Sequence, residues 1–154
     1  MQTHQQLIDE RFMDRALELA RQAGSVNEVP VGALVVLEGQ IVASAGNRCV
    51  SEHDPCAHAE VLALREAART LQTCRLDKAT LYVTLEPCLM CCGALLQSRI
   101  ARLVYGAREP KTGAVVSVHE SLRLQGVSHH VAITEGVHAA QATELLQSFF
   151  RLRR

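Results

Sequence analysis

The sequence predicts a single α/β domain, built on a five-stranded mixed sheet with helices on both faces. Its 154 residues suit one domain. Hydrophobic residues make up 48% of the chain, which is enough to form a buried core. Segments with strand character alternate with segments of helical periodicity, as in domains whose parallel strands are joined by helices.

The first predicted elements are a helix and a β-hairpin. Residues 8–23 place apolar side chains at helical spacing, and Gly24 follows as a stop signal. Two short runs rich in β-branched residues, 31–37 and 40–45, then flank Glu38-Gly39. A turn between two such runs predicts a hairpin, which supplies the antiparallel part of the sheet.

Two helices and two strands are predicted for the middle of the chain. Ala, Leu, Glu and Arg dominate residues 58–71, so this segment is expected to be helical. Residues 80–85 read TLYVTL, a composition typical of strands. Pro87 is expected to open a helix that runs to about residue 98, because N–H groups in the first turn of a helix are unpaired and proline has none. Residues 101–105 form the fourth predicted strand.

A strand at residues 130–134 and a helix at 139–151 complete the fold, after a segment at 106–126 that is mostly loop with a short helix. The helix over residues 89–97 (LMCCGALLQ) is apolar on almost every side, so it must be buried all round. The sheet covers one face of this helix, and a neighbouring subunit is the predicted cover of another. We therefore expect a homodimer, with burial under the chain's own loops as the alternative.

Composition and charge restrict the classes of protein that this sequence represents. Lys plus Arg and Asp plus Glu both number 16, so the net charge of zero gives no overall case for a nucleic-acid partner. The N-terminus lacks the pattern of a secretory signal, and the apolar runs are too short to span a bilayer. We expect a cytoplasmic protein without a membrane partner. Its six cysteines are then reduced, and a clustered pair indicates metal binding.

The candidate metal ligands are His58, Cys88 and Cys91. The two cysteines are spaced i, i+3 at the start of a predicted helix, so they share one face where the helix dipole favours thiolates. His58 begins another helix and supplies an imidazole. Three protein ligands are typical of a catalytic zinc site, whose fourth position holds a water with a pKa of about 7. Glu60 is the candidate proton acceptor for that water.

Two other interpretations of this group stay open. The cysteine pair can be core thiols, with the histidine as a helix cap. A structural zinc site would need a fourth ligand, for which His53, Cys56 and Cys92 are candidates. Cys92 is about 100° round the helix from Cys91 and points elsewhere, whereas Cys56 remains a candidate. A structural site does not explain Glu60, which favours the catalytic interpretation.

Motifs along the whole chain resemble those of one enzyme family. The pattern H-x-E followed by P-C-x-x-C is the signature of zinc deaminases that act on nucleobases. Beyond that signature, the chain resembles the bacterial tRNA-specific adenosine deaminases of the TadA type, in the cytidine deaminase-like superfamily. The further motifs are EVPVGA at 28–33, NR at 47–48, HDP at 53–55, TLYVTLEPCLMC at 80–91, SRI at 98–100, GAR at 106–108, KTGA at 111–114 and FFRLRR at 149–154. KTGA and the arginine-rich tail resemble the tRNA-acting branch in particular.

The resemblance implies a fold, a reaction and partners. The fold is a three-layer α/β/α sandwich, and the protein is a homodimer with one zinc ion per subunit. The reaction converts adenosine at the wobble position of a tRNA anticodon stem-loop to inosine, with Glu60 moving the protons. Asn47 is expected to hydrogen-bond the flipped base, while Val31, Ala59 and Leu85 shape its pocket. Without the resemblance, Asn47 would be interpreted as a turn residue and the apolar residues as core.

RNA contacts are expected from the loop after the fourth strand and from the C-terminal tail. The basic candidates are Arg108, Lys111, Arg151, Arg153 and Arg154, whose charges can neutralise phosphates. Phe149 is a candidate for stacking on a base, with core packing as the alternative for it or Phe150. Glu109 and Pro110 stand where relatives typically have Asp after Gly-Ala-Arg, and this acid is expected to contact the RNA sugar. Arginines at a helix C-terminus also favour the helix dipole, so the role of the tail stays open.

Two other functions stay open from the sequence. A deaminase of a free nucleobase or nucleoside, of the cytosine, guanine or cytidine type, would share the metal chemistry and differ in accepting the free compound. A zinc-stabilised RNA-binding or dimer-partner subunit would have no need of Glu60, so this residue favours an enzyme.

Overall fold

The computed structural model describes residues 1–153, which form a five-stranded mixed sheet. The strands are β1 (Gly32–Leu37), β2 (Gln40–Gly46), β3 (Thr80–Leu85), β4 (Arg102–Ala107) and β5 (Ala132–Thr134). Their order in the sheet is β2-β1-β3-β4-β5. β1 is antiparallel to both β2 and β3, whereas β3, β4 and β5 run parallel to one another. The predicted hairpin and mixed sheet are confirmed.

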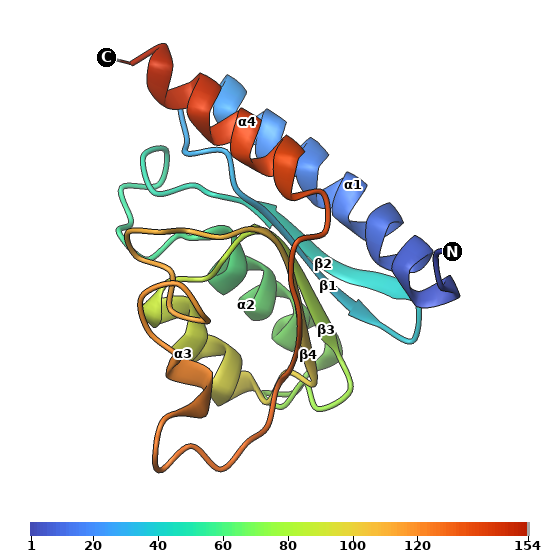
Figure 1. The fold of residues 1–154 in the computed structure, drawn as a ribbon. Helices are drawn as coiled ribbons and strands as arrows, with labels where there is room; N and C mark the ends of the chain where they lie inside the picture. The colour runs from blue at the N-terminus through green and yellow to red at the C-terminus, as the bar shows by residue number, and fades with distance from the viewer. Residues whose placement is uncertain (154) are drawn as a thin grey trace.

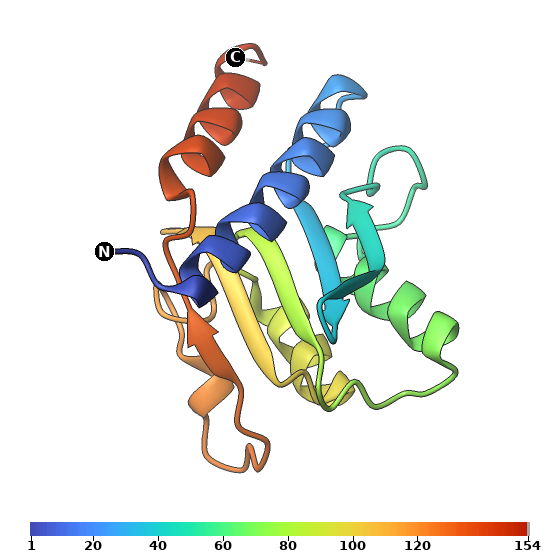
Figure 2. The same ribbon diagram turned by 90° about the vertical axis from the view of Figure 1, so that its right-hand side faces the viewer.

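Helices cover both faces of this sheet. The helices are α1 (His4–Ser25), α2 (Ala59–Leu71), α3 (Leu89–Ser98) and α4 (Ala139–Arg151), with a short 3-10 helix at Ser121–Arg123. α1 and α4 lie side by side on one face, and α2 and α3 lie on the other (Figures 1 and 2). The expected three-layer α/β/α architecture is therefore confirmed. None of the described helices is long and apolar enough to cross a membrane.

Helix starts differ from the sequence-based expectations where caps decide them. α1 begins at His4, four residues early, because Thr3 and Gln6 form a capping box. The prediction that Pro87 lies in the first turn of α3 is wrong. Cys88 is the N-cap of α3, which places Pro87 outside the helix. The Pro87 carbonyl accepts a hydrogen bond from Ala114 N–H at 2.9 Å instead.

The sheet separates two hydrophobic clusters. One lies under α2 and α3, and its largest fully buried members include Leu81, Val83, Leu95, Leu103 and Tyr105. The other lies under α1 and α4 and includes Met13, Leu17, Leu34, Tyr82 and Val104. The approach of α1 to the sheet requires Gly32, because a Cβ there would lie 2.1 Å from the Ala16 carbonyl oxygen.

A buried ion pair fastens α1 to the sheet. The Asp9 carboxylate is 2% exposed and accepts hydrogen bonds from both terminal nitrogens of Arg102, at 2.8 and 2.6 Å. The Tyr82 hydroxyl donates a third hydrogen bond to Asp9, at 2.7 Å. Since Tyr82 and Arg102 stand on β3 and β4, one carboxylate holds α1 across two strands.

α3 does not bury all of its apolar surface within one chain. Cys91, Cys92 and Leu95 are fully buried against the core. Leu89 and Met90 are 58% and 37% exposed. The expectation that this helix is covered on every side is therefore not met by the loops of the chain itself.

Candidate active site

Two helix starts bring His58, Cys88 and Cys91 together. His58 is the N-cap of α2, Cys88 is the N-cap of α3, and Cys91 is the third residue of α3. His58 Nδ1 lies 3.6 Å from the Cys88 Sγ and 3.5 Å from the Cys91 Sγ. One ligand atom from each residue lies within 4.8 Å of the others. This spacing allows the three side chains to bind one metal ion.

The thiols of this group have strongly perturbed pKa values. A hydrogen bond from the Cys91 thiol, aided by His58, lowers the pKa of Cys88 to about 4. The same hydrogen bond and burial raise the pKa of Cys91. The hydrogen bond with Cys88 also raises the pKa of His58. A thiolate beside a second thiol and an imidazole is a soft donor set that fits zinc.

The structure offers no fourth protein ligand within residues 1–153. The Cys92 Sγ points to the Pro87 carbonyl oxygen at 3.9 Å, and His53 and Cys56 are exposed. Only the His/Cys/Cys group meets the spacing of a metal site in this part of the chain. Three ligands are the number found at catalytic zinc sites, so the donor set fits a catalytic ion better than a structural one.

Glu60 lies in the first turn of α2, beside His58, Cys88 and Cys91. Its side chain is 4% exposed, and burial raises its pKa above the ordinary value. A carboxyl whose pKa is shifted toward neutrality both accepts and returns protons efficiently. Glu60 is therefore suited to acid-base catalysis in the same cavity.

A cavity of about 220 Å³ joins these groups. Its lining includes the predicted residues Val31, Asn47, His58, Glu60, Leu85, Cys88 and Glu109. Ala59 is fully buried and is not part of the lining. Cys91, Lys111, Phe149 and Arg153 also lie outside the lining. The walls thus come from segments far apart in the sequence.

Asn47 is tied to the start of α2. Its Oδ1 accepts a hydrogen bond from Ala59 N–H at 2.7 Å. This bond satisfies one of the N–H groups that a helix start leaves unpaired. The hydrogen bond also orients the Asn47 amide, whose NH₂ group can meet a ligand.

Two buried glutamates in the lining, Glu28 and Glu86, were missed as site residues. Glu28 is 1% exposed and accepts hydrogen bonds from Val50 N–H at 3.0 Å and Ser51 N–H at 2.7 Å. It thereby holds the loop between Asn47 and His58. Burial works to raise the pKa of Glu28, but these hydrogen bonds bring it below the ordinary value. In the sequence, each of these glutamates closely precedes a proline, Glu28 before the start of β1 and Glu86 after the end of β3. This was the one signal that could have identified them.

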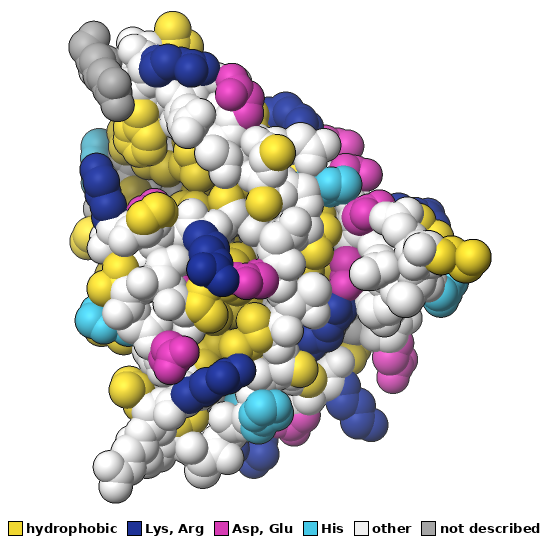
Figure 3. Space-filling view, viewed as in Figure 1, with side chains coloured by type: hydrophobic (Ala, Val, Ile, Leu, Met, Phe, Trp, Pro, Cys, Tyr) yellow, Lys and Arg dark blue, Asp and Glu magenta, His cyan; other side chains and the backbone are white. Residues whose placement is uncertain are grey.

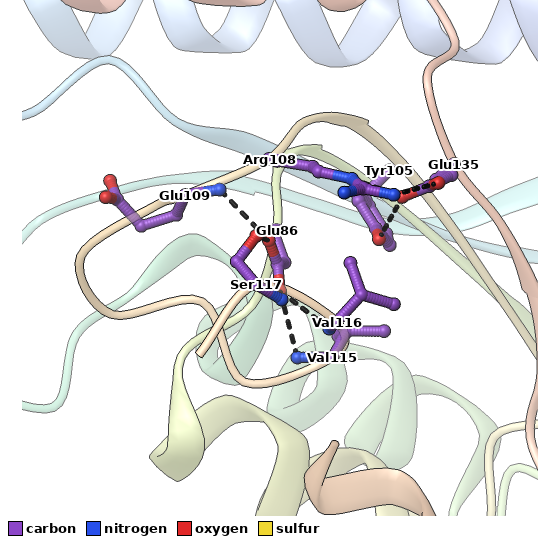
Figure 4. Close-up of polar contacts among 8 residues, drawn as sticks. All are labelled: Glu86, Tyr105, Arg108, Glu109, Val115, Val116, Ser117 and Glu135. Atoms are coloured by element: carbon purple, nitrogen blue, oxygen red, sulfur yellow. Dashed lines mark hydrogen bonds and ion pairs between the residues drawn. The ribbon is translucent and has the colours of Figure 1, made fainter. Parts of the chain in front are cut away.

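Most predicted RNA-binding arginines are engaged within the chain. Arg108 binds Glu135 through two nitrogens, at 2.8 and 3.1 Å, and Tyr105 donates to the same carboxylate (Figure 4). Arg151 binds Glu144 at 3.2 Å. On the face seen in Figure 3, basic side chains are scattered among acidic ones and form no continuous patch. Arg154 lies outside the described residues.

Arg153 joins the C-terminal end of the chain to the connection between α1 and β1. Its guanidinium carbon lies 3.5 Å from the centroid of the Phe149 ring. It also donates to Asn27 Oδ1 at 2.8 Å, in the connection between α1 and β1. Lys111 is exposed in the loop after β4, where its backbone N–H donates to the Glu109 carboxylate at 2.9 Å.

An α/β/α fold that brings a His/Cys/Cys group and a buried glutamate into one cavity defines a hydrolytic deaminase. Known proteins agree with this class. Residues 8–154 match the MafB19-like deaminase family. The chain is 46% identical to the tRNA-specific adenosine deaminase of Haemophilus influenzae, over 96% of this chain and 86% of that protein.

Solved structures of two deaminases are similar to this chain. One from a study of A-to-I editing by tRNA:A34 deaminases has a TM-score of 0.86 and 43% identity, covering 88% of this chain and 99% of that one. The guanine deaminase from Nitrosomonas europaea has a TM-score of 0.77 and 30% identity, covering 91% and 83%. The chain belongs to the MafB19-like deaminase family and to the family of tRNA-specific adenosine deaminases.

Proposed function

We propose that this protein deaminates adenosine to inosine at the wobble position of a tRNA anticodon. The observation that carries the proposal is the buried Glu60 beside the His58, Cys88 and Cys91 group, with Glu60, His58 and Cys88 lining one cavity. The similarity to tRNA-specific adenosine deaminases supplies the substrate. The reaction replaces the bond from carbon 6 of adenine to its amino nitrogen with a bond to oxygen, and it releases ammonia.

The mechanism assigns the metal to the His/Cys/Cys group and proton transfer to Glu60. His58, Cys88 and Cys91 would hold one zinc ion per subunit, which would supply a Lewis acid that lowers the pKa of water to about 7. Glu60 accepts a proton from the attacking water and delivers it to a ring nitrogen of adenine. Glu60 then takes the remaining proton from the new hydroxyl on carbon 6 and passes it to the leaving amino group, so that ammonia departs and the carbonyl of inosine forms. Burial raises the pKa of Glu60 above its ordinary value, which favours its role in proton transfer.

The base would enter the cavity flipped out of the RNA. Asn47 would present its NH₂ group to an acceptor on the base, because the hydrogen bond from Ala59 N–H orients the amide. Val31 and Leu85 provide apolar walls. A base enclosed in this way is read by contacts to its edge and faces.

The RNA backbone would lie across the mouth of the cavity. Glu109 lines the cavity and is assigned to the ribose. Lys111 and Arg153 are assigned to phosphates, and Phe149 supports the Arg153 guanidinium. With these contacts, the protein would bind the sugar and phosphates of an anticodon stem-loop as well as the base.

We also propose a homodimer in the cytoplasm, where tRNA is modified. The exposed apolar side chains of Leu89 and Met90 on α3 support an interface there. A monomer by light scattering at micromolar concentration would contradict this part of the proposal.

The first experiment compares substrates. The purified protein is incubated with an adenosine-containing anticodon stem-loop, and separately with adenosine, cytidine, cytosine and guanine, and inosine and ammonia are measured. Inosine from the stem-loop alone supports the proposal. Ammonia from a free compound with the RNA untouched would move the protein to a free-base or nucleoside deaminase, as for the guanine deaminase of similar fold.

The second experiment tests the role of Glu60. The Glu60→Gln variant should keep its zinc content and fold but lose at least about 10²-fold in kcat, because general acid-base catalysis contributes that much. Glu66→Gln is the matched control, since Glu66 is exposed on the same helix. Full activity in Glu60→Gln would refute the assignment.

A further inference from the structure

Glu86 is a buried carboxylate that the proposed reaction does not use. It follows the last residue of β3, is 2% exposed and lines the active-site cavity. Its two oxygens accept hydrogen bonds from the backbone N–H groups of Glu109 at 3.0 Å, Val115 at 3.0 Å, Val116 at 2.9 Å and Ser117 at 3.0 Å. The Ser117 hydroxyl donates a further one. Figure 4 shows these donors converging on the single side chain.

All of these donors belong to the loop that follows β4. Glu86 therefore acts as the centre around which residues 109–117 are wrapped. Gly113 allows the close approach, because a Cβ there would lie 2.4 Å from the Glu86 carboxyl carbon. The loop is also bound to Pro87, the residue after Glu86, because Ala114 N–H donates to the Pro87 carbonyl oxygen.

This loop forms part of the cavity wall. Glu109 and Thr112 line the cavity, and Lys111 lies between them in the sequence. If this loop became ordered only when RNA binds, the loss of its conformational entropy would weaken the affinity for RNA. A loop that is already wrapped on a carboxylate avoids that loss.

We propose that Glu86 is a positioning residue for the RNA substrate, which holds residues 109–117 as a preformed wall of the active site. The inference rests on the proposed function, because its role is defined by the stem-loop. The five hydrogen bonds that Glu86 accepts all come from this loop. Loss of Glu86 should therefore weaken substrate binding more than it slows the chemical step.

The test is the Glu86→Gln variant of the full chain with its zinc bound. Glutamine replaces one acceptor oxygen with an NH₂ group, which then faces backbone N–H donors. We expect KM for the anticodon stem-loop to rise by about tenfold or more, while kcat changes by less than about threefold. Hydrogen exchange at the amides of residues 115–117 should accelerate by about tenfold or more in the free protein.

Glu135→Gln is the matched control. It makes the same chemical change in a neighbouring cluster, where the carboxylate binds Arg108 and Tyr105 and no backbone N–H of the loop (Figure 4). Its KM and its exchange at residues 115–117 should stay within about threefold of the wild type. If Glu86→Gln does not fold, Ser117→Ala removes one donor and should produce the same two changes at smaller size.

The outcomes separate this inference from the proposed function. Wild-type KM and wild-type exchange in Glu86→Gln would overturn the role of Glu86 while deamination of the stem-loop stands. A fall confined to kcat would also overturn it. A wild-type protein that leaves the stem-loop untouched would overturn the proposed function, and the substrate role of Glu86 with it, even where exchange at the loop accelerates.

Discussion

Replacing Asp9 with alanine should destabilise the protein without impairing the folded enzyme. The carboxylate is buried and accepts three hydrogen bonds from Arg102 and Tyr82. Its loss leaves the Arg102 guanidinium, whose side chain is only 22% exposed, without its charge partner. Breaking a buried ion pair from one side typically costs 3–5 kcal/mol, roughly. Arg102 keeps a hydrogen bond to Thr134 at 2.9 Å, so we expect the lower end, about 3 kcal/mol.

Urea denaturation at pH 7, followed by circular dichroism, measures this loss as a change in midpoint at constant slope. For a domain of this size, about 3 kcal/mol corresponds to a fall in Tm of roughly 6–12 °C. The value of kcat at 25 °C should be unchanged per folded molecule, because Asp9 is not part of the cavity lining.

Two controls make the prediction specific to burial. Glu18→Ala removes one partner of the exposed pair between Arg15 and Glu18, and it should change the free energy of unfolding by less than about 1 kcal/mol. The double variant Asp9→Ala/Arg102→Met should lose less than Asp9→Ala alone, because no buried charge is left unpaired. A loss below about 1 kcal/mol in Asp9→Ala would refute the reasoning.

Three further predictions follow from contacts elsewhere in the chain. Hydrogen bonds outweigh burial and hold the pKa values of Asp9 and Glu28 below their ordinary values of 3.8 and 4.5. Their stabilising effect is therefore present above these values and lost as pH falls below them, so urea midpoints should drop in acid, and less steeply in Asp9→Ala. Lys111→Ala and Arg153→Ala should each lower the slope of log affinity against log salt by about 0.7 for the stem-loop; an unchanged slope would exclude the phosphate contact. Arg153→Ala should in addition lower the free energy of unfolding by about 1 kcal/mol, through loss of the Phe149 and Asn27 contacts. Gln72→Gly should raise the free energy of unfolding by roughly 0.5 kcal/mol, because Gln72 ends α2 with φ of 54°, where glycine has no steric penalty; a lower midpoint would contradict this.

Local patterns were sufficient to predict most of the fold. Strand β3 and helix α4 begin and end at the predicted residues, since alternation and composition are properties of short segments. The candidate metal ligands could also be found from the sequence. Cys88 and Cys91 lie three residues apart, and both His58 and Cys88 stand at helix starts. The error at Pro87 arose because the helix start depends on which residue serves as the cap.

Contacts between distant segments were beyond prediction from the sequence. The donors that surround Glu86 lie 23 to 31 residues further along the chain. Arg153 and Asn27 are 126 residues apart. A charged residue has the same appearance in a sequence whether it meets RNA or an oxygen of its own chain. Only the fold shows that Arg108 and Arg153 already have partners.

The hydrogen bond between Asn47 and the start of α2 also bears on how purines are told apart. The hydrogen bond from Ala59 N–H orients the Asn47 amide, and its NH₂ group can offer hydrogen-bond donors to a base. Adenine and guanine both carry unprotonated ring nitrogens that accept such a donor. A donor from Asn47 therefore does not choose between the two purines. Other residues in the walls of the cavity must therefore distinguish adenine from guanine.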